Sequence, residues 1–183
     1  MENLKQKVAD CKACELCKTN PQKICGNGDV QAKIMIVGEA GGKNEAKQGK
    51  PFCGMSGKLL DIGLKSGGLS RERVWVTNCL KCRPPDNRQP TDDELIACRV
   101  FITAELDIVK PKLLVLLGRT AIKNFLPELD TIPIRELRGE VFEVAGLPPM
   151  IITYHPTAAL RNKQTKGIFL TDVQNLGRIE RSL

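Results

Sequence analysis

Four short hydrophobic runs divide the chain, and each is continuous rather than alternating with polar residues. They cover residues 33–38, 74–79, 113–118 and 150–154. A strand that is covered by helices on both faces has this pattern, because neither face meets water. We therefore predict four buried parallel strands at these positions. Residues 137–144 are predicted to form a small β element outside this pattern.

Stretches with helical spacing lie between these runs. Leucine and isoleucine recur at helical intervals in residues 58–66 and in Asp92–Val109, and residues 120–125 begin another helix. Thr91 is a suitable N-cap for the second of these helices, because Glu94 follows three residues later. The alternation of strands and helices favours an α/β fold, with three layers (α/β/α) around a central four-stranded parallel sheet.

The length and composition indicate one domain that spans residues 1–183. The chain has 183 residues, of which 42% are hydrophobic, so it can form a real core. No hydrophobic run approaches the length of a membrane span, and the first ten residues, MENLKQKVAD, lack the apolar part of a secretion signal. We therefore expect a soluble intracellular protein of the cytoplasm, with no membrane partner.

The charge balance bears on the kind of partner. Lys and Arg together number 28 against 21 Asp and Glu, which gives a net charge of +7. This favours a polyanionic partner such as nucleic acid, although many basic proteins bind none. Aromatic residues make up only 4% of the chain, which argues against the broad base-stacking sheet of many RNA-binding proteins.

Eight cysteines in an intracellular chain indicate a metal site or simple burial rather than disulfides. Cys11, Cys14 and Cys17 form C-x2-C-x2-C in a lysine-rich segment, and Cys79 and Cys82 form another C-x2-C. Thiolates two residues apart can share one metal, and the spacing suits zinc and iron–sulfur clusters equally. Burial alone is the alternative that suits Cys79, which lies in a predicted strand.

Three candidate site residues lie in or beside the loops that follow the predicted strands. The carboxyl ends of parallel strands share one edge of the sheet, and ligands bind there in such folds. Phe52 lies in a glycine-rich loop without a phosphate-loop motif, and it either packs on the core or stacks on a planar ligand. Asn78 is either a turn residue or a ligand contact. His155, the single histidine of the chain, is either structural or catalytic.

Three segments each match a longer motif of one known family. GEAGGKNEAKQGKPFCGMSGKLL resembles GEAPGxxEDxxGxPFVGxAGxLL, TNCLKCRPPDNRQP resembles TNxxKCRPPxNRxP, and YHPTAALRN resembles HPxxLLRNP. These motifs are those of the uracil-DNA glycosylase superfamily, specifically of the family 4 type with an iron–sulfur cluster from archaea and thermophilic bacteria. The resemblance spans nearly the whole chain. It implies a DNA-repair enzyme that flips uracil out of DNA and hydrolyses its N-glycosidic bond to leave an abasic site.

The resemblance also implies a cofactor. A 4Fe–4S cluster would be held by four cysteines, namely Cys11, Cys14, Cys82 and Cys98. The cluster would tie the N-terminal segment to the body of the fold, with Cys17 as a spare thiol. The competing hypothesis is a non-catalytic nucleic-acid-binding module with a zinc site, whose ligands would be Cys14, Cys17, Cys79 and Cys82.

The resemblance assigns substrate contacts at the strand ends. The flipped uracil would lie on Phe52 and against the loop that contains Gly38 and Ala40, with Asn78 reading its edge. Cytosine offers the reverse donor and acceptor pair, so the amide of Asn78 has to be held in one orientation. Glu45 would lie beside C5 of the base, where it would exclude the methyl group of thymine.

The remaining roles concern the reaction and the DNA. His155 would donate a hydrogen bond to O2 of the departing uracil anion, as in an oxyanion hole. Glu39 would orient the attacking water. Leu160 would wedge into the DNA with Arg161 near a phosphate, although Leu160 also suits the core of a helix.

The chain departs from the family pattern at three positions. Gly41 replaces Pro, Ala46 replaces an acidic residue, and Cys53 replaces Val. These changes bear on the substrate range, so hypoxanthine and xanthine stay as alternative bases. We expect uracil-containing DNA, single- or double-stranded, as the partner of a nucleoid-associated monomer, and we keep a sliding clamp as a candidate protein partner.

Overall fold

The computed structural model describes residues 1–20 and 22–183, and its centre is a six-stranded sheet in the order β1-β3-β2-β4-β6-β5. The strands are β1 (Asn27–Gly28), β2 (Ile34–Gly38), β3 (Trp75–Asn78), β4 (Leu113–Leu117), β5 (Val141–Phe142) and β6 (Met150–Thr153). The four inner strands, β3, β2, β4 and β6, are parallel and coincide with the four predicted strands. The α/β class is therefore confirmed.

The number of strands is corrected from four to six. β1 and β5 pair antiparallel with β3 and β6 at the two edges, each through only two residues. Pairs this short leave no hydrophobic pattern that sequence periodicity can detect. The β element predicted at residues 137–144 contains β5, which joins the sheet instead of lying outside it.

Helices of very different lengths connect the strands. They are α1 (Glu2–Ala9), α2 (Leu16–Thr19), α3 (Lys43–Gln48), α4 (Met55–Ser66), α5 (Asp92–Val109), α6 (Arg119–Phe125), α7 (Ile134–Leu137), α8 (Pro156–Arg161) and α9 (Lys163–Ser182). α5 has the predicted bounds, and the predicted cap is confirmed: Glu94 N donates to Thr91 Oγ1 (3.2 Å), while Thr91 N donates to Glu94 Oε2 (2.9 Å). Within the described residues, no helix is both long and apolar enough to cross a membrane.

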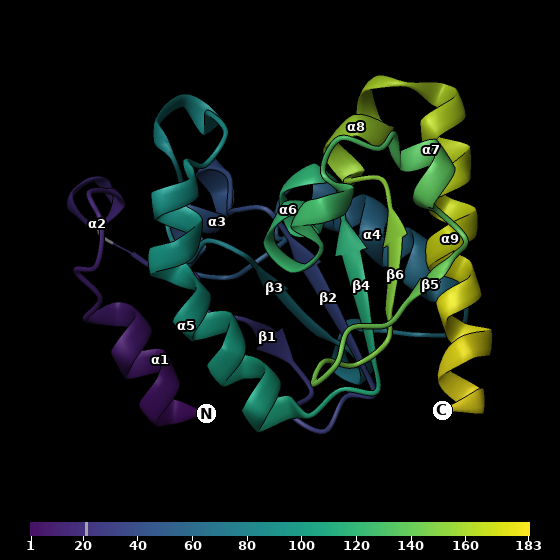
Figure 1. The fold of residues 1–183 in the computed structure, drawn as a ribbon, viewed down its shortest axis with the longest axis horizontal. Helices are drawn as coiled ribbons and strands as arrows, with labels where there is room; N and C mark the ends of the chain where they lie inside the picture. Colours follow the sequence, from purple (N-terminus) through teal and green to yellow (C-terminus); the bar gives the residue numbers. More distant parts are fainter. Residues whose placement is uncertain (21) are drawn as a thin grey trace.

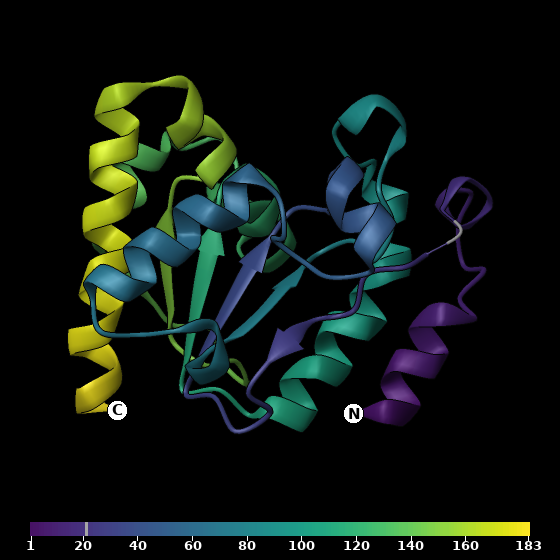
Figure 2. The same ribbon diagram turned by 180° about the vertical axis from the view of Figure 1, so that it is seen from behind.

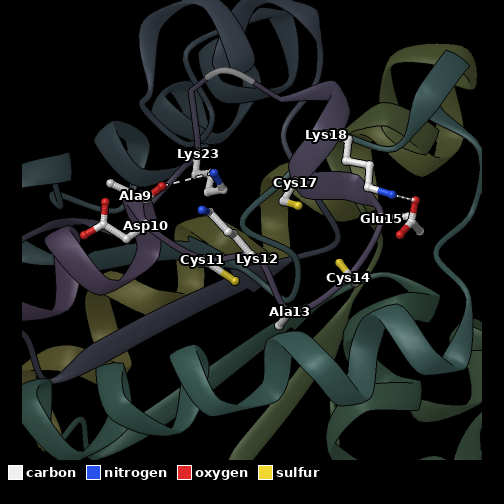
Figure 3. Close-up of a pocket in the computed structure, with 10 residues that line it drawn as sticks. All are labelled: Ala9, Asp10, Cys11, Lys12, Ala13, Cys14, Glu15, Cys17, Lys18 and Lys23. Atoms are coloured by element: carbon white, nitrogen blue, oxygen red, sulfur yellow. Dashed lines mark hydrogen bonds and ion pairs between the residues drawn. The ribbon is translucent and has the colours of Figure 1, made fainter.

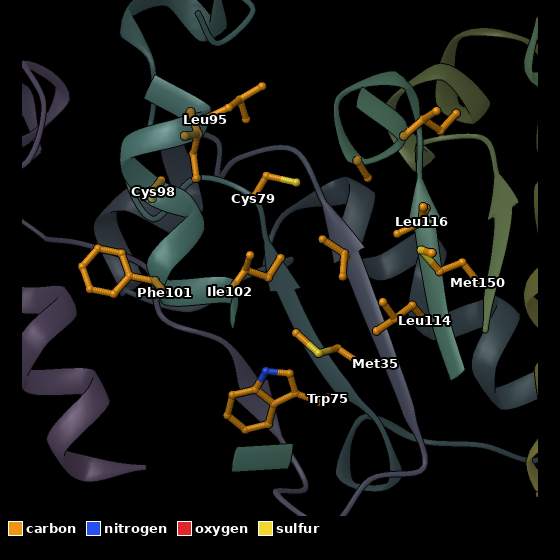
Figure 4. Close-up of a cluster of buried hydrophobic side chains, with 14 of the residues drawn as sticks. Met35, Trp75, Cys79, Leu95, Cys98, Phe101, Ile102, Leu114, Leu116 and Met150 are labelled. Atoms are coloured by element: carbon orange, nitrogen blue, oxygen red, sulfur yellow. The ribbon is translucent and has the colours of Figure 1, made fainter. Parts of the chain in front are cut away.

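Helices cover both faces of the sheet, as Figures 1 and 2 show from opposite sides. Met35 and Val37 of β2 belong to the core beneath α1, α5 and α6, whereas Ile34 and Ile36 belong to the core beneath α4, α8 and α9. Figure 4 shows part of the first core, where side chains of the sheet face Ile102 of α5. The alternation along one strand explains why each inner strand is hydrophobic throughout.

The inner strands end at the edge of the sheet that lies at the top of Figure 1, beside α6 and α8. The chain turns sharply there after β4. Gly118 has a φ of +84°, and a Cβ on it would come within 2.8 Å of the Cβ of His155. A glycine at this position therefore allows the loops after β4 and β6 to approach closely.

Candidate active site and thiolate cavity

A cavity of about 790 Å³ opens at the carboxyl edge of the sheet, within the size range of small-molecule sites. Seven of the predicted site residues line it, namely Glu39, Ala40, Glu45, Phe52, Asn78, His155 and Arg161. Gly38 lies beneath it: a Cβ there would come within 2.5 Å of Phe52 Cζ and 2.6 Å of Asn78 Oδ1. The fold thus brings together residues from three motifs that are far apart in the sequence.

The ring of Phe52 is held firmly at this cavity. Its side chain is only 6% exposed, and its backbone has a φ of +52°, a conformation that costs energy for a residue other than glycine. Arg71 Nη2 donates to the Phe52 carbonyl (2.7 Å), and the Arg71 guanidinium lies 5.8 Å from the ring centroid. Gly57 passes so close that a Cβ would come within 1.7 Å of the Phe52 carbonyl oxygen. The ring is therefore positioned before any ligand arrives.

Asn78 is the last residue of β3, and its side chain is almost fully buried at 1% exposure. Its Oδ1 has no hydrogen-bond partner within the described chain. Nearly all buried polar atoms in proteins are paired, so an unpaired amide oxygen on a cavity wall is suited to accept a hydrogen bond from a ligand.

His155 follows β6 and N-caps α8. Its Nδ1 accepts a hydrogen bond from Thr157 N (3.2 Å), which leaves the ring proton on Nε2. Nε2 is buried and has no partner among the described residues. Burial lowers the pKa of His155 to about 4, although Glu45 opposes this shift. The imidazole is therefore neutral at physiological pH, with one N–H group free to donate. The sequence left this protonation state open.

The two glutamates of the loop have different surroundings. Glu45 joins both ends of the loop, because its Oε2 accepts from Gly42 N (3.0 Å) and its Oε1 accepts from Gly54 N (2.7 Å). Glu39 accepts a hydrogen bond from the hydroxyl of Thr120 at the start of α6. Sequence reasoning missed the contribution of Thr120, although its position three residues after β4 was a usable signal.

The two residues predicted to contact DNA are Leu160 and Arg161. Leu160 lies in α8 and is 41% exposed, so it is not a helix-core residue. Arg161 lines the cavity together with Lys43 and Arg88, which were not predicted. Arg88 is paired with Glu94 (2.5 Å), whereas Lys43 and Arg161 place positive charge at the mouth.

A second cavity lies between the N-terminal segment and α5. Five cysteines line it, namely Cys11, Cys14, Cys17, Cys82 and Cys98. Figure 3 shows the first three with their sulfur atoms turned toward one another inside one loop. Cys79 instead packs in the first core (Figure 4), where burial raises its pKa to about 12. This position argues against the zinc site that included Cys79.

The cysteines of this cavity influence one another electrostatically. Burial and then Cys98, Cys14 and Cys11 raise the pKa of Cys82 to about 12, with Lys23 opposing. Burial also raises the pKa of Cys98, and Cys11 and Cys14 add to that shift. Burial, Cys11 and Cys17 raise the pKa of Cys14, so Cys17 belongs to the same group of interacting thiols. In residues 1–20 and 22–183, no three His, Cys, Asp or Glu side chains are placed to hold one metal ion.

Comparison with known proteins decides the family. Residues 25–175 match the model of the uracil DNA glycosylase superfamily. The chain belongs to this superfamily. The type-4 uracil-DNA glycosylase of Sulfurisphaera tokodaii is 39% identical over 182 residues, which cover 96% of this chain and 83% of that protein. The type-4 enzyme of Thermotoga maritima is 37% identical over 176 residues (95% and 91%), and that of Archaeoglobus fulgidus is 36% identical over 184 residues (98% and 92%).

Membership of the uracil DNA glycosylase superfamily confirms the resemblance seen in the three sequence motifs. The matched region begins at residue 25 and so leaves out Cys11, Cys14 and Cys17. The relatives cover almost the whole chain, including this segment.

Proposed function

We propose that the protein is a uracil-DNA glycosylase, which hydrolyses the N-glycosidic bond of a uracil flipped out of DNA and leaves an abasic site. The observation that carries this proposal is the pair of unpaired buried polar atoms, Asn78 Oδ1 and His155 Nε2, on one cavity beside the ring of Phe52. One acceptor, one donor and one stacking surface are what a flipped pyrimidine needs.

Base recognition follows from Asn78. Uracil carries a hydrogen on N3, which Asn78 Oδ1 would accept, and the amide N–H would donate to O4. Cytosine has a lone pair at N3 and would face Oδ1 with a second acceptor, which is unfavourable. Glu45 would form the wall beside C5. Its carboxylate is fixed by two backbone N–H groups, which supports a rigid barrier to the methyl group of thymine.

Bond cleavage would depend on charge stabilisation. The uracil leaves as an anion, and the Nε2–H of the neutral His155 would donate to its O2, with the backbone N–H groups near Gly38 and Ala40 adding to the effect. Glu39 would orient the attacking water on the other side of the sugar, and the hydroxyl of Thr120 would fix the Glu39 carboxylate for this role.

DNA would be engaged at the rim of the cavity. The exposed Leu160 would fill the space left by the flipped base, and Arg161 would contact a phosphate beside it. We further propose that the enzyme acts as a monomer on single- or double-stranded DNA near the nucleoid. A sliding clamp stays a candidate partner.

The thiolate cavity suits a 4Fe–4S cluster. We propose four ligands, Cys11, Cys14, Cys82 and Cys98. In such a cluster each thiolate binds a different iron, so the ligands surround a cavity rather than converge on a single ion. Their place on one cavity supports this set, and the family resemblance selects these four over Cys17, which lines the same cavity. When bound, the cluster would supply a covalent tie between the N-terminal segment and α5.

The test uses oligonucleotides that contain one uracil, followed by alkaline cleavage of abasic sites. We expect nicking at uracil, and none with thymine or cytosine at the same position. Oligonucleotides with hypoxanthine or xanthine test the alternative bases. The His155→Leu variant is the control for a contaminating glycosylase, because it should lose most of the activity. Absence of nicking at uracil by the unaltered protein would contradict the proposal.

A further inference from the structure

Lys81 is a fully buried cation next to the proposed base-reading residue. It is 1% exposed and is one of the residues that line the thiolate cavity. Its Nζ donates to Thr77 Oγ1 (2.7 Å), to the backbone carbonyl of Asn78 (3.0 Å) and to Glu105 Oε2 (2.9 Å). An ammonium group has three protons, so each donor of Lys81 is used.

Glu105 of α5 completes the network and is 0% exposed. Its second oxygen, Oε1, accepts from Gly26 N (2.9 Å) and from Cys25 Sγ (3.6 Å). The network therefore spans the end of β3, helix α5 and the segment before β1. Removing two charges from water is costly, and well-packed apolar residues often serve stability equally well. Stability alone thus gives a weak reason for this ion pair.

The surroundings of the Asn78 side chain give a stronger reason. No side chain among the described residues donates to its Oδ1, so the orientation of the amide depends on the backbone that carries it. That backbone lies at the last position of β3, where regular strand pairing ends. Lys81 Nζ holds the Asn78 carbonyl at this point, and Cys79 N donates to the carbonyl of Gly38 (2.9 Å) directly after it.

We propose that Lys81, neutralised by Glu105, is a positioning residue that fixes the backbone of Asn78 and thereby directs its amide at the base. The inference rests on the proposed function and gives a role to Lys81, which the motif around Asn78 contains without an assigned role, and to Glu105, which lies outside the three motifs. Lys81 also lies against the thiolate cavity, because its backbone N donates to Cys98 Sγ (3.3 Å). A change at Lys81 therefore has to be separated from an effect on the cysteines.

The decisive variant is Lys81→Met combined with Glu105→Gln, which removes both charges and leaves no isolated ion in the core. We expect single-turnover excision of uracil to fall by about 10- to 100-fold, the range typical of a misplaced contact group. DNA affinity should stay unchanged, because phosphate contacts do not involve this pair. The visible absorbance per mole of protein should also stay unchanged, since the four proposed thiolate ligands are intact.

Combination with Asn78→Ala provides the sharpest distinction. If Lys81 acts through Asn78, adding Lys81→Met and Glu105→Gln to Asn78→Ala should not lower the excision rate further. A full additional loss in that background would overturn the proposal, as would wild-type excision by the charge-free variant. If the double variant Lys81→Met/Glu105→Gln does not fold, Thr77→Val replaces it. This change keeps the shape of the side chain and removes one contact of Lys81, and its effect is measured with and without Asn78→Ala in the same way.

Glu180→Gln is the matched control. Glu180 is 8% exposed and pairs with Arg73 (2.8 Å) through α9, on the other face of the sheet. This variant should excise uracil at the wild-type rate. If its rate falls as much as that of the Lys81/Glu105 double variant, general destabilisation explains both losses and the proposal is overturned. A wild-type protein without uracil excision would instead overturn the proposed function. An active wild-type protein with additive losses would overturn only the role of Lys81.

Discussion

His155→Leu removes the side-chain donor that we propose for the departing base. Nδ1 is occupied by Thr157 N, so of the two ring nitrogens only Nε2–H can donate to the uracil anion. Loss of one donor of this kind lowers the rate by about 10²–10³, or roughly 3–4 kcal/mol at 1.36 kcal/mol per tenfold. The effect belongs to the transition state, so DNA affinity should hardly change. His155→Gln is the matched variant, because its amide can still donate from a similar position and should retain part of the rate.

The assay is single-turnover excision of uracil, with DNA affinity and thermal stability measured in parallel. Because the pKa of His155 is lowered to about 4, its protonation should not affect the rate between about pH 5.5 and 8. Excision by His155→Leu at the wild-type rate would refute the donor role. A rate that follows a pKa near the ordinary value of 6.5, and loses that dependence in His155→Gln, would refute the neutral imidazole.

Three further predictions concern stability, the cysteines and the base pocket. The folded pKa of His155 lies below its ordinary value of 6.5, so the unfolded chain takes up a proton more readily, and the free energy of unfolding should decrease by up to about 3 kcal/mol as the pH falls from 6.5 to 4. Urea unfolding should show this decrease in the wild type and lack it in His155→Leu. Alanine substitutions at the proposed ligands should remove the visible absorbance of a cluster, whereas Cys17→Ala should preserve it; the reverse pattern would contradict the ligand set of Cys11, Cys14, Cys82 and Cys98. Gly38→Ala should slow excision by about 10²-fold and lower the melting temperature slightly, because its Cβ would lie 2.5 Å from Phe52 Cζ, and full activity would show that the pocket tolerates the methyl group.

Local sequence patterns predicted the elements whose formation depends on neighbouring residues in the sequence. The inner strands are hydrophobic on both faces, and α5 begins at a capping box, so periodicity and one cap sufficed. The edge strand β1 depends on a pairing partner about 50 residues along the chain, which no local pattern records. The β element that contains β5 was predicted, but its pairing with β6 at the edge of the sheet was not. α9 went unpredicted although Phe169, Val173 and Leu176 are buried at helical spacing, because the surrounding residues are mostly polar.

The sequence likewise predicted only part of the candidate site. Motifs identified Phe52, Asn78 and His155 one at a time, and the fold places all three on one cavity. Motifs did not reveal that Thr120 holds Glu39, because this contact joins two residues that are 81 positions apart in the sequence. The contact from Lys81 to the Asn78 carbonyl lies within one motif, but only the folded backbone shows that the Lys81 side chain turns back to it.

The cost of leaving polar atoms unpaired explains why such supports are needed. A buried donor or acceptor without a partner costs roughly 1–3 kcal/mol, and the cavity contains two, on Asn78 and His155. Either side chain would lower this cost by turning toward another polar group or toward water. The Nδ1 contact from Thr157 opposes rotation of the His155 ring, and the contact from Lys81 holds the backbone that carries the Asn78 side chain. An active site with unpaired buried atoms therefore depends on neighbouring residues that keep those atoms from pairing elsewhere. Sequence motifs alone do not identify these supporting residues.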